Sequence, residues 1–305
     1  MEKIIELKNI NKSYGKGVKA LNDVSLTVFE GDIFGLVGSN GAGKSTILKL
    51  LSGAILKDSG DISILGNTND DIIKSFSKMG FLIERPNFYG DLTGLDNLKY
   101  LCKLRGLDLG GALEIAKEFG IENALKKKIK GYSTGMRQRL GLVVTFMHRP
   151  EILVLDEPIN GLDPEGITYL RNYILNVNRK WNSTVIISSH ILNELSLIAN
   201  RYALIKNGKI IEEVSRTEVE EKSKKYICIE VDKEDLSKTT ALLEMNFEGL
   251  NYNVYPHGEI RIFSDLDRKK LQKFLVDNSV YVTTIKEKGL DLEDYYLEKI
   301  GGEND

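Results

Sequence analysis

One stretch of the 305-residue chain has the residue types and the spacing of a loop that binds phosphate. It runs Gly38, Ser39, Asn40, Gly41, Ala42, Gly43, Lys44, Ser45, Thr46. This order fits the pattern G-x-x-x-x-G-K-[ST], in which backbone N–H groups surround the phosphates of a nucleotide. In that chemistry Lys44 reaches the β- and γ-phosphates, and the hydroxyl of Ser45 binds Mg²⁺. The stretch therefore predicts a site for a nucleoside triphosphate and its magnesium ion.

The residues on both sides of this loop suit the same chemistry. Residues 32–37 form a short apolar run typical of a buried strand, and Ile47, Leu48, Leu50 and Leu51 recur at helical spacing. A strand, a glycine-rich turn and a helix place the helix N-terminus, with about half a positive charge, at the phosphates. The alternative is a glycine-rich turn that matches the pattern by chance. Such a turn would not require a strand before it and a helix after it, so these flanks favour the phosphate site.

Two carboxylates follow another apolar run. Residues 152–155 are Ile-Leu-Val-Leu, and Asp156 and Glu157 come next. Adjacent side chains of a strand point to opposite faces, so we expect the two acids to have different roles. One can bind Mg²⁺ through water, and the other can polarise an attacking water. An Asp-Glu pair after a surface strand is common, so this interpretation depends on the phosphate loop upstream.

Three more places in the chain suit a nucleotide site. His190 ends an apolar strand, residues 184–188, at the edge where α/β sheets bind ligands, although a lone histidine is more often structural. Ser133 stands at an expected helix N-cap, and Gly135 leaves that helix N-terminus open to an anion. An ordinary capped helix would explain the same two residues. Tyr14 could stack on a base or lie in a surface turn, and its position alone favours neither.

The length of 305 residues predicts two domains, and the composition is that of an ordinary soluble globular protein. The chain is 42% hydrophobic and 28% charged, and its net charge of −2 gives no general reason to bind nucleic acid. Its two cysteines, Cys102 and Cys228, lack metal-type spacing, so we expect a reducing compartment. The first residues do not resemble a signal peptide, and no apolar run approaches the ~20 residues that span a bilayer. Work at a membrane would need a partner that holds the protein there.

The elements expected to position these residues form an α/β core with a mostly helical insertion. Further strands are predicted over residues 3–8, 20–28, 61–65 and 79–83. A short helix is predicted over residues 70–77, and a longer one over residues 165–179. In the insertion, leucines recur at three-residue steps from Leu92 to Leu104, which indicates an amphipathic helix, and residues 111–119 predict another. The basic run at residues 126–128 is typical of a solvated face.

The chain from about residue 215 predicts a separate small domain after a charged helical linker at residues 214–225. Strands are expected over residues 226–231, 251–254, 259–263 and 280–286. Helices are expected over residues 233–244, 267–276 and 290–300. Without the last helix, the order is β-α-β-β-α-β, the pattern of a ferredoxin-like unit. No catalytic constellation occurs in this part of the sequence, so dimer support, regulation and an inert covering domain all stay open.

Taken together, these residues resemble the ATP-binding subunit of an ABC transporter over about residues 1–215. The matching motifs are Walker A at residues 38–46, the signature at 132–136, Walker B at 152–157 and the D-loop at 160–163. The resemblance implies a P-loop NTPase core of ABC type with an N-terminal antiparallel β subdomain. It also implies a helical subdomain over about residues 85–140, and it leaves residues 216–305 as an accessory α+β domain.

The resemblance implies a role for each residue within one chain. Tyr14 would stack on the adenine of ATP. Glu157 would be the general base for water, with Lys44 and His190 as the other catalytic residues, and His190 would contact the γ-phosphate. Asp156 would be the partner of Mg²⁺.

The resemblance also implies partners. Two such domains pair head to tail around two ATP molecules, so Ser133 and Gly135 would bind the γ-phosphate held by a second copy. Closure of this homodimer would drive separately encoded membrane permease subunits. The expected location is therefore the cytoplasm, at the cytoplasmic face of the cell membrane, and no nucleic acid partner is expected.

Two features depart from the family pattern. Thr134 and Met136 stand where glycine and glutamine are usual in the signature, and a slow ATPase is the expectation. Glu84 stands at about the place of the Q-loop glutamine, where its carboxylate would be a third ligand for Mg²⁺ beside Ser45 and Asp156. Residues 84–94 resemble the exporter subgroup that confers resistance to bacitracin and lantibiotic peptides.

Three functions remain in competition. The first is the ATPase of an exporter for an antimicrobial peptide, antibiotic or similar amphipathic compound. The second is a soluble ABC-type ATPase that acts on nucleic acid, although such proteins carry long coiled-coil or zinc insertions that this sequence lacks. The third is a small P-loop GTPase or kinase, which would not explain residues 132–140 or His190.

Overall fold

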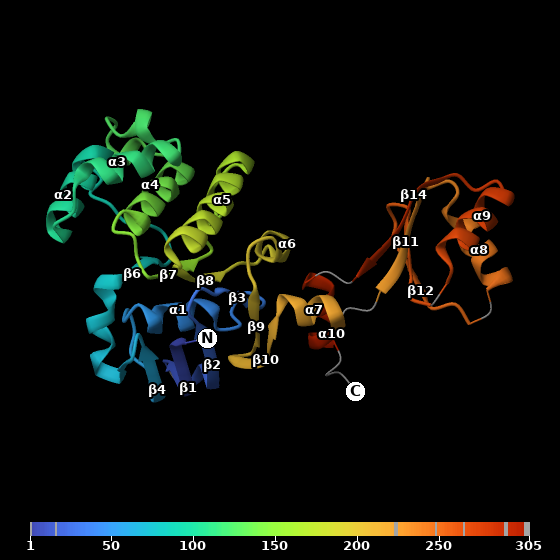
Figure 1. Cartoon of the computed structure of the whole chain (residues 1–305), viewed down its shortest axis with the longest axis horizontal. Helices are drawn as coiled ribbons and strands as arrows, with labels where there is room; N and C mark the ends of the chain where they lie inside the picture. Colours follow the sequence, from blue (N-terminus) through green and yellow to red (C-terminus); the bar gives the residue numbers. More distant parts are fainter. Residues whose placement is uncertain are drawn as a thin grey trace. The chain divides into compact units, whose positions relative to one another are not determined.

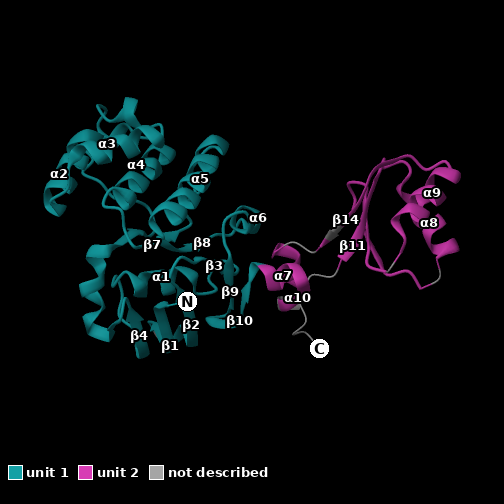
Figure 2. Cartoon of the chain, in the orientation of Figure 1, with its two compact units in different colours: residues 1–216 teal, residues 217–305 magenta. Residues whose placement is uncertain are grey.

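The computed structural model describes residues 2–15, 17–222, 225–247, 249–264, 266–289 and 292–301 of the chain. The chain divides into two units, Met1–Arg216 and Thr217–Asp305 (Figure 2). The first unit contains two sheets and a group of helices, and the second contains one small sheet with helices (Figure 1).

A six-stranded sheet of order β10-β9-β3-β8-β7-β6 forms the centre of the first unit. Its strands are β3 (Ile33–Val37), β6 (Met79–Leu82), β7 (Ile152–Asp156), β8 (Thr184–Ser188), β9 (Arg201–Lys206) and β10 (Lys209–Ser215). Neighbours pair in parallel except β9 and β10, which are antiparallel. Every residue of β3, β7 and β8 is buried, as expected of strands covered on both faces. The residues that follow these three strands therefore meet at one edge of the sheet.

A second, antiparallel sheet of order β2-β1-β4-β5 lies across helix α1 (Lys44–Leu51) from the first sheet (Figure 1). Its strands are β1 (Lys3–Tyr14), β2 (Val18–Phe29), β4 (Ser59–Ile64) and β5 (Asn67–Thr68). The first two are longer than predicted, because their pairing continues to Tyr14 and Val18. Apolar side chains of both sheets and of α1 form one core. The antiparallel β subdomain is thus confirmed.

Three helices form the predicted helical insertion and pack together in Figure 1. They are α2 (Gly94–Arg105), α3 (Leu109–Glu118) and α4 (Thr134–Phe146). The side chains of Thr93, Asp108 and Ser133 each accept a backbone N–H as N-caps. Because Thr93 caps α2, this helix begins after Leu92, where the leucine spacing had suggested its start.

Short helical segments and two further helices complete the first unit. The short 3₁₀ segments are η1 (Asn69–Lys78), η2 (Glu122–Ala124) and η3 (Ile129–Gly131). Helix α5 (Pro164–Trp181) follows β7, and helix α6 (Leu192–Ser196) follows β8. Asp163 caps α5 by accepting the N–H of Gly166, and Pro164 occupies its first turn, where the missing N–H costs nothing.

The second unit has the predicted ferredoxin-like topology. Its elements are α7 (Arg216–Lys222), β11 (Lys225–Val231), α8 (Leu236–Asn246), β12 (Tyr252–Val254), β13 (Glu259–Ile262), α9 (Arg268–Asp277), β14 (Val282–Gly289) and α10 (Leu292–Gly301). The sheet order is β12-β13-β11-β14, and all three pairings are antiparallel. The prediction of a helical linker over residues 214–225 is wrong at its start, because Val214 and Ser215 extend β10 by pairing with β9.

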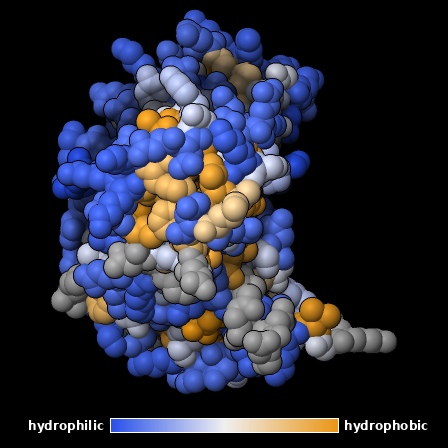
Figure 3. Space-filling view, turned by 90° about the vertical axis from the view of Figure 1, so that its right-hand side faces the viewer, coloured by the Kyte–Doolittle hydropathy of each residue, from blue (hydrophilic) through white to orange (hydrophobic). Residues whose placement is uncertain are grey.

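The surface of the second unit carries several exposed apolar side chains. Met245 is 83% exposed, Tyr281 79% and Val276 62%. Figure 3 shows apolar side chains gathered near the centre of one face of the molecule, with hydrophilic ones around them. Among the described helices, none combines the length and the apolar character needed to cross a bilayer.

Candidate functional site

The predicted phosphate loop connects β3 to α1. Within it, the N–H of Ala42 donates to the carbonyl oxygen of Ser39 at 3.1 Å. A side chain at Gly38 would lie 2.5 Å from the carbonyl oxygen of Ile205, and Gly43 has a φ of +118°, so both positions require glycine. Gly43 is also the N-cap of α1 and has no side chain that could accept the first N–H groups of that helix. The start of α1 thus offers backbone donors to an anion.

Lys44 is buried although the tip of the loop is open to solvent. The exposed tip consists of Ser39, Asn40 and Gly41. The Nζ of Lys44 donates to the carbonyl oxygens of Gly38 at 2.6 Å and of Ser39 at 3.2 Å. Burial lowers the pKa of Lys44, while the negative charges of Glu157 and Asp156 act to raise it. The ammonium group is therefore held by carbonyl oxygens of the loop. A bound phosphate would be a stronger, charged acceptor and could take their place.

Asp156 ends β7 beside the first turn of α1. Its Oδ1 accepts hydrogen bonds from the Oγ of Ser45 at 3.1 Å and from the Oγ of Ser188 at 2.6 Å. Two ligands on adjacent corners of an octahedral Mg²⁺ lie about 3 Å apart, because Mg–O bonds measure roughly 2.0–2.1 Å. The oxygens of Ser45 and Asp156 therefore fit the magnesium ion for which the sequence proposed them.

Glu157 lies one residue beyond β7 and meets His190, which lies just beyond β8. The Nδ1 of His190 is 2.6 Å from the Oε2 of Glu157, and the backbone N–H of His190 donates to the same oxygen at 3.3 Å. An ionised carboxylate only accepts, so Nδ1–H is the donor. Glu157 has a φ of +47°, a strained conformation for a residue that is not glycine. The hydrogen bond from its own N–H to the Oγ of Ser188, at 3.0 Å, helps to hold that turn.

Ser133 and Gly135 lie in a second group, at the start of α4. The Oγ of Ser133 accepts the N–H of Met136 at 3.2 Å, which is the predicted cap. A side chain at Gly135 would lie 2.6 Å from the carbonyl oxygen of Gly161, so the predicted signature packs directly on the predicted D-loop. Arg139 strengthens this contact through an ion pair with Asp163 at 2.5 Å. Within one chain, the two residues are therefore held against the D-loop.

The contact with the D-loop also explains one departure from the family pattern. If Gly161 carried a side chain, its Cβ would lie only 2.9 Å from the Cγ2 of Thr134. Gly161 has a φ of +80° and no side chain, so the threonine fits there. Thr134 thus replaces the usual glycine at no steric cost within the chain.

Tyr14 and Glu84 flank the phosphate loop from other elements. Tyr14 ends β1 and is 40% exposed, and the Nζ of Lys12 lies 5.9 Å from its ring centre. Its ring is therefore accessible to a base. Glu84, which follows β6, forms an ion pair with Lys49, one helical turn beyond Ser45. The structure thus pairs Glu84 with Lys49, and its role as a magnesium ligand stays a prediction.

Ser188 joins the candidate site, although its place in the sequence did not single it out. Its hydroxyl joins Asp156 and the N–H of Glu157, and Asp156 and Ser188 are direct partners in the parallel pairing of β7 with β8. A signal was present, since each of the two apolar strands ends in polar residues. The sequence does not give the register between β7 and β8, and this register is what places Ser188 beside Asp156.

Comparison with known proteins places these features in one family. The family described as ABC transporter matches residues 21–160. The chain is 36% identical over 305 residues to the bacitracin transport ATP-binding protein BcrA of Bacillus licheniformis, covering 99% of each chain. It is 39% identical over 208 residues to the lantibiotic transport ATP-binding protein SrtF of Streptococcus pyogenes, covering 68% of this chain and 89% of that one.

Solved structures agree with the fold. A dimeric bacterial ABC transporter cassette, MJ0796, superposes with a TM-score of 0.64 at 26% identity, covering 70% of this chain and 98% of the other. An ATP-binding subunit of an ABC transporter superposes with a TM-score of 0.63 at 26% identity, covering 72% of this chain and 92% of the other. The predicted ABC-type P-loop NTPase core is thus confirmed. These relatives give no support to the nucleic-acid alternative.

Proposed function

The chain belongs to the ATP-binding proteins of ABC transporters and is an ATPase of that family, and we propose that its ATP hydrolysis drives an exporter through separate membrane subunits. The observation that carries the catalytic part of this proposal is the Glu157–His190 pair. It lies at the same sheet edge as the phosphate loop, and its Nδ1–Oε2 distance is 2.6 Å. A carboxylate and an imidazole at this place can orient a water against the last phosphate of a bound ATP.

Each residue of the first group has a part in this reaction. The phosphate loop and Lys44 bind and orient the phosphates, and Tyr14 stacks on the adenine. Ser45 and Asp156 hold Mg²⁺, which when bound neutralises phosphate charge. Glu157 accepts the proton of the attacking water, and His190 orients Glu157 and contacts the γ-phosphate.

A second copy of the chain completes the site. Ser133 and Gly135 lie on the D-loop of their own chain, and we assign them to the γ-phosphate bound by the partner. The dimeric cassette with 26% identity supports a pairing of this kind. Because Gly135 and Gly161 have no side chains, their backbones lie in close contact. The signature and the D-loop can therefore face the partner together.

The membrane subunits have a suitable surface on the helical insertion. A hollow there is lined by Asn87, Phe88, Tyr89, Asn97, Tyr100, Leu101 and Leu104. Leu104 is 65% exposed, Tyr89 57% and Tyr100 43%, so the hollow offers apolar area to a partner. The first lining residue, Asn87, comes three residues after Glu84, and Glu84 pairs with Lys49 of α1, the helix that follows the phosphate loop. A permease bound in this hollow would therefore lie near the phosphate loop. Binding there would keep the chain at the cytoplasmic face of the membrane.

The names of the relatives indicate the cargo. BcrA is named for transport of bacitracin and SrtF for transport of a lantibiotic, and LnrL of Bacillus subtilis, 34% identical over 224 residues, is named for linearmycin resistance. We therefore propose an antimicrobial peptide, antibiotic or similar amphipathic compound as the exported substrate.

The test of the catalytic part is Glu157→Gln, which keeps the shape of the side chain but removes the base. We expect ATP turnover to fall by roughly 10²–10⁴-fold, and ATP to hold the variant as a dimer in size-exclusion chromatography. Glu151→Gln is the matched control, because Glu151 lies before β7 and its side chain forms an exposed ion pair, 2.9 Å long, with Lys78. A Glu157→Gln protein that hydrolyses ATP at the normal rate would remove Glu157 from its assigned role.

A further inference from the structure

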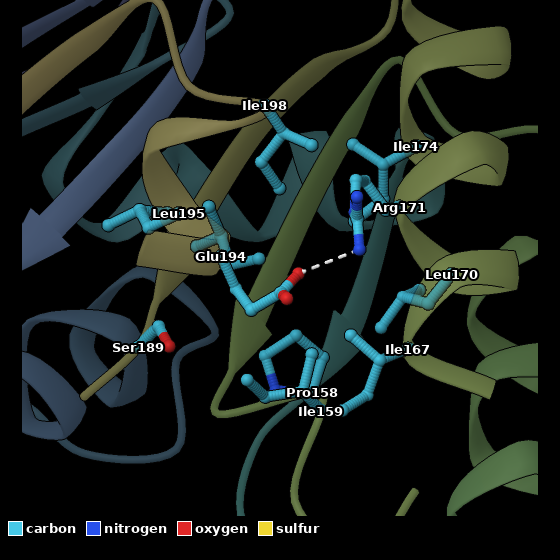
Figure 4. A pocket seen from close by; sticks show the side chains of 11 residues that line it. Pro158, Ile159, Ile167, Leu170, Arg171, Ile174, Ser189, Glu194, Leu195 and Ile198 are labelled. Carbon is cyan, nitrogen blue, oxygen red and sulfur yellow. Dashed lines mark ion pairs between the residues drawn. The ribbon is translucent and has the colours of Figure 1, made fainter. Parts of the chain in front are cut away.

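A small cavity lies beside the two backbone segments that carry Glu157 and His190. Pro158 and Ile159, which follow Glu157, form one wall, and Ser189, which precedes His190, forms another (Figure 4). Helices α5 and α6 supply most of the remaining walls, together with Ile187 of β8 and Ile198, which follows α6. The cavity measures about 20 Å³, roughly the space of one water molecule and too little for a ligand. The two backbone segments that carry Glu157 and His190 thus share one packed support.

An ion pair crosses this cavity from α5 to α6. The Nη2 of Arg171 lies 3.1 Å from the Oε2 of Glu194, and the two side chains are only 27% and 30% exposed. Figure 4 shows both side chains pointing toward each other between the two helices. The Nε of Arg171 is buried and has no hydrogen-bond partner in the described part of the chain. The pair is therefore partly desolvated, so that breaking it would leave each charge incompletely hydrated.

The two helices differ in how firmly they are fixed. Helix α5 has 18 residues, and the Arg139–Asp163 ion pair holds the capping residue at its start. Near its end, the Nδ2 of Asn178 donates to the carbonyl oxygens of Gly31 at 2.8 Å and of Ser183 at 2.9 Å. Helix α6 has five residues, of which Leu192 and Leu195 are buried. The long helix is thus the fixed support, and the short one depends on what it packs against.

The short helix sets the place of His190. It begins two residues after His190, and Glu194 lies four residues after it. A rotation of α6 would move the connecting backbone and draw the imidazole away from Glu157. Reacting groups tolerate little of this, because a misplacement of about 1 Å can cost roughly 100-fold in rate.

We propose that the Arg171–Glu194 ion pair is a positioning pair that holds α6 against α5 and thereby keeps His190 on Glu157. The effect on turnover rests on the proposed function of Glu157 and His190, whereas the effect on the position of His190 does not. Arg171 and Glu194 act through α6 and do not touch the nucleotide site themselves.

The test uses the side-chain resonances of the histidines in the full chain without nucleotide. The chain has three histidines, so each imidazole signal can be assigned by substitution. In Glu194→Gln we expect the signal of His190 to move while those of His148 and His257 stay in place. We also expect kcat to fall by roughly tenfold, with little change in KM for ATP because the phosphate loop is untouched.

Glu213→Gln is the matched control. Glu213 forms an ion pair with Arg201 at 3.3 Å, with 28% and 20% of the two side chains exposed, at the opposite end of the sheet. We expect this variant to keep the His190 signal and kcat, even if its melting temperature falls. The exchange of charges in Arg171→Glu with Glu194→Arg should restore both readouts at least in part.

The outcomes separate this proposal from the proposed function. A His190 signal that stays in place in folded Glu194→Gln overturns the positioning role, whatever the rate. If Glu194→Gln does not fold, Arg171→Lys keeps the charge but alters the contact, and an unmoved signal there overturns the role equally. A Glu157→Gln protein with normal turnover would contradict the catalytic assignment and leave the His190 result standing.

Discussion

Each unit of this protein contains a cluster of charged side chains removed from water, and the two clusters differ in how their charges are satisfied. In the first unit, the partners of Lys44 and Asp156 are neutral carbonyl and hydroxyl oxygens. In the second unit, Glu259 accepts from the Nε of Arg261 at 2.7 Å, and the same guanidinium pairs with Asp294 at 2.8 Å. The first cluster thus leaves charge for a ligand, whereas the second neutralises its own.

The ring contacts make the same distinction. The Arg261 guanidinium lies 4.6 Å from the ring centre of Tyr255 and 5.2 Å from that of Tyr226, so its faces are covered as well. Tyr14, beside the phosphate loop, keeps 40% of its surface exposed. Burial of charge therefore does not by itself mark a functional site. A charge whose partners are weak and replaceable is the better indicator.

Removal of Lys44 should have the largest effect and should separate activity from stability. We expect Lys44→Met to reduce ATP turnover by at least ~10³-fold, because the transferred phosphate loses its charged ligand. The free energy of unfolding should change by no more than about 1 kcal/mol, since the direct hydrogen-bond partners of the lysine are neutral carbonyl oxygens. Steady-state kinetics and chemical denaturation check both parts. A loss of stability as large as that expected next for Arg261 would contradict the contrast between the clusters.

Removal of Arg261 should have the opposite profile. We expect Arg261→Met to destabilise the second unit by about 3 kcal/mol, because two partly buried carboxylates lose their counter-charge. Hydrogen exchange of the second-unit amides measures this, and ATP turnover should stay within twofold. Lys225→Met is the matched control, since Lys225 is 79% exposed and lies 3.9 Å from Glu287. Such a surface pair should contribute less than ~1 kcal/mol.

Acid should weaken the second cluster through Glu259. Burial acts to raise its pKa, but hydrogen bonds from Arg261 and His257 outweigh burial and lower it from 4.5 to about 2. A carboxyl with a lowered pKa contributes stability above its unfolded value and loses it as pH falls through the folded value, so the loss should occur between pH 4.5 and 2. The contribution is about 3 kcal/mol.

The measurement is the pH dependence of unfolding, with the His257 resonance as the probe of the second unit. Glu259→Gln should be less stable at neutral pH and should lack this acid-dependent loss. Equal acid profiles of the native chain and the variant would remove Glu259 as the source.

Local pattern was sufficient for much of the fold and for the individual motifs. The glycine loop, the cap at Ser133 and the ends of β7 and β8 could be predicted because each depends on neighbouring residues and on burial periodicity. The ferredoxin-like topology followed from the order of strands and helices, since short connections allow few alternatives. Predicted boundaries were wrong where pairing with the neighbouring strand extends an element, as for β1 at Tyr14 and for β10, which includes the first two residues of the predicted linker.

The sequence by itself determined the local motifs, because the phosphate loop, the helix caps and the strand ends each consist of contiguous residues. Only the tertiary structure decided how they meet. Ser188 joins Asp156 through strand register, Glu84 takes Lys49 as its partner, and Arg171 reaches Glu194 across a cavity. The physical reason is that spacing along a chain fixes which face of an element a side chain occupies, but not which other face it will contact.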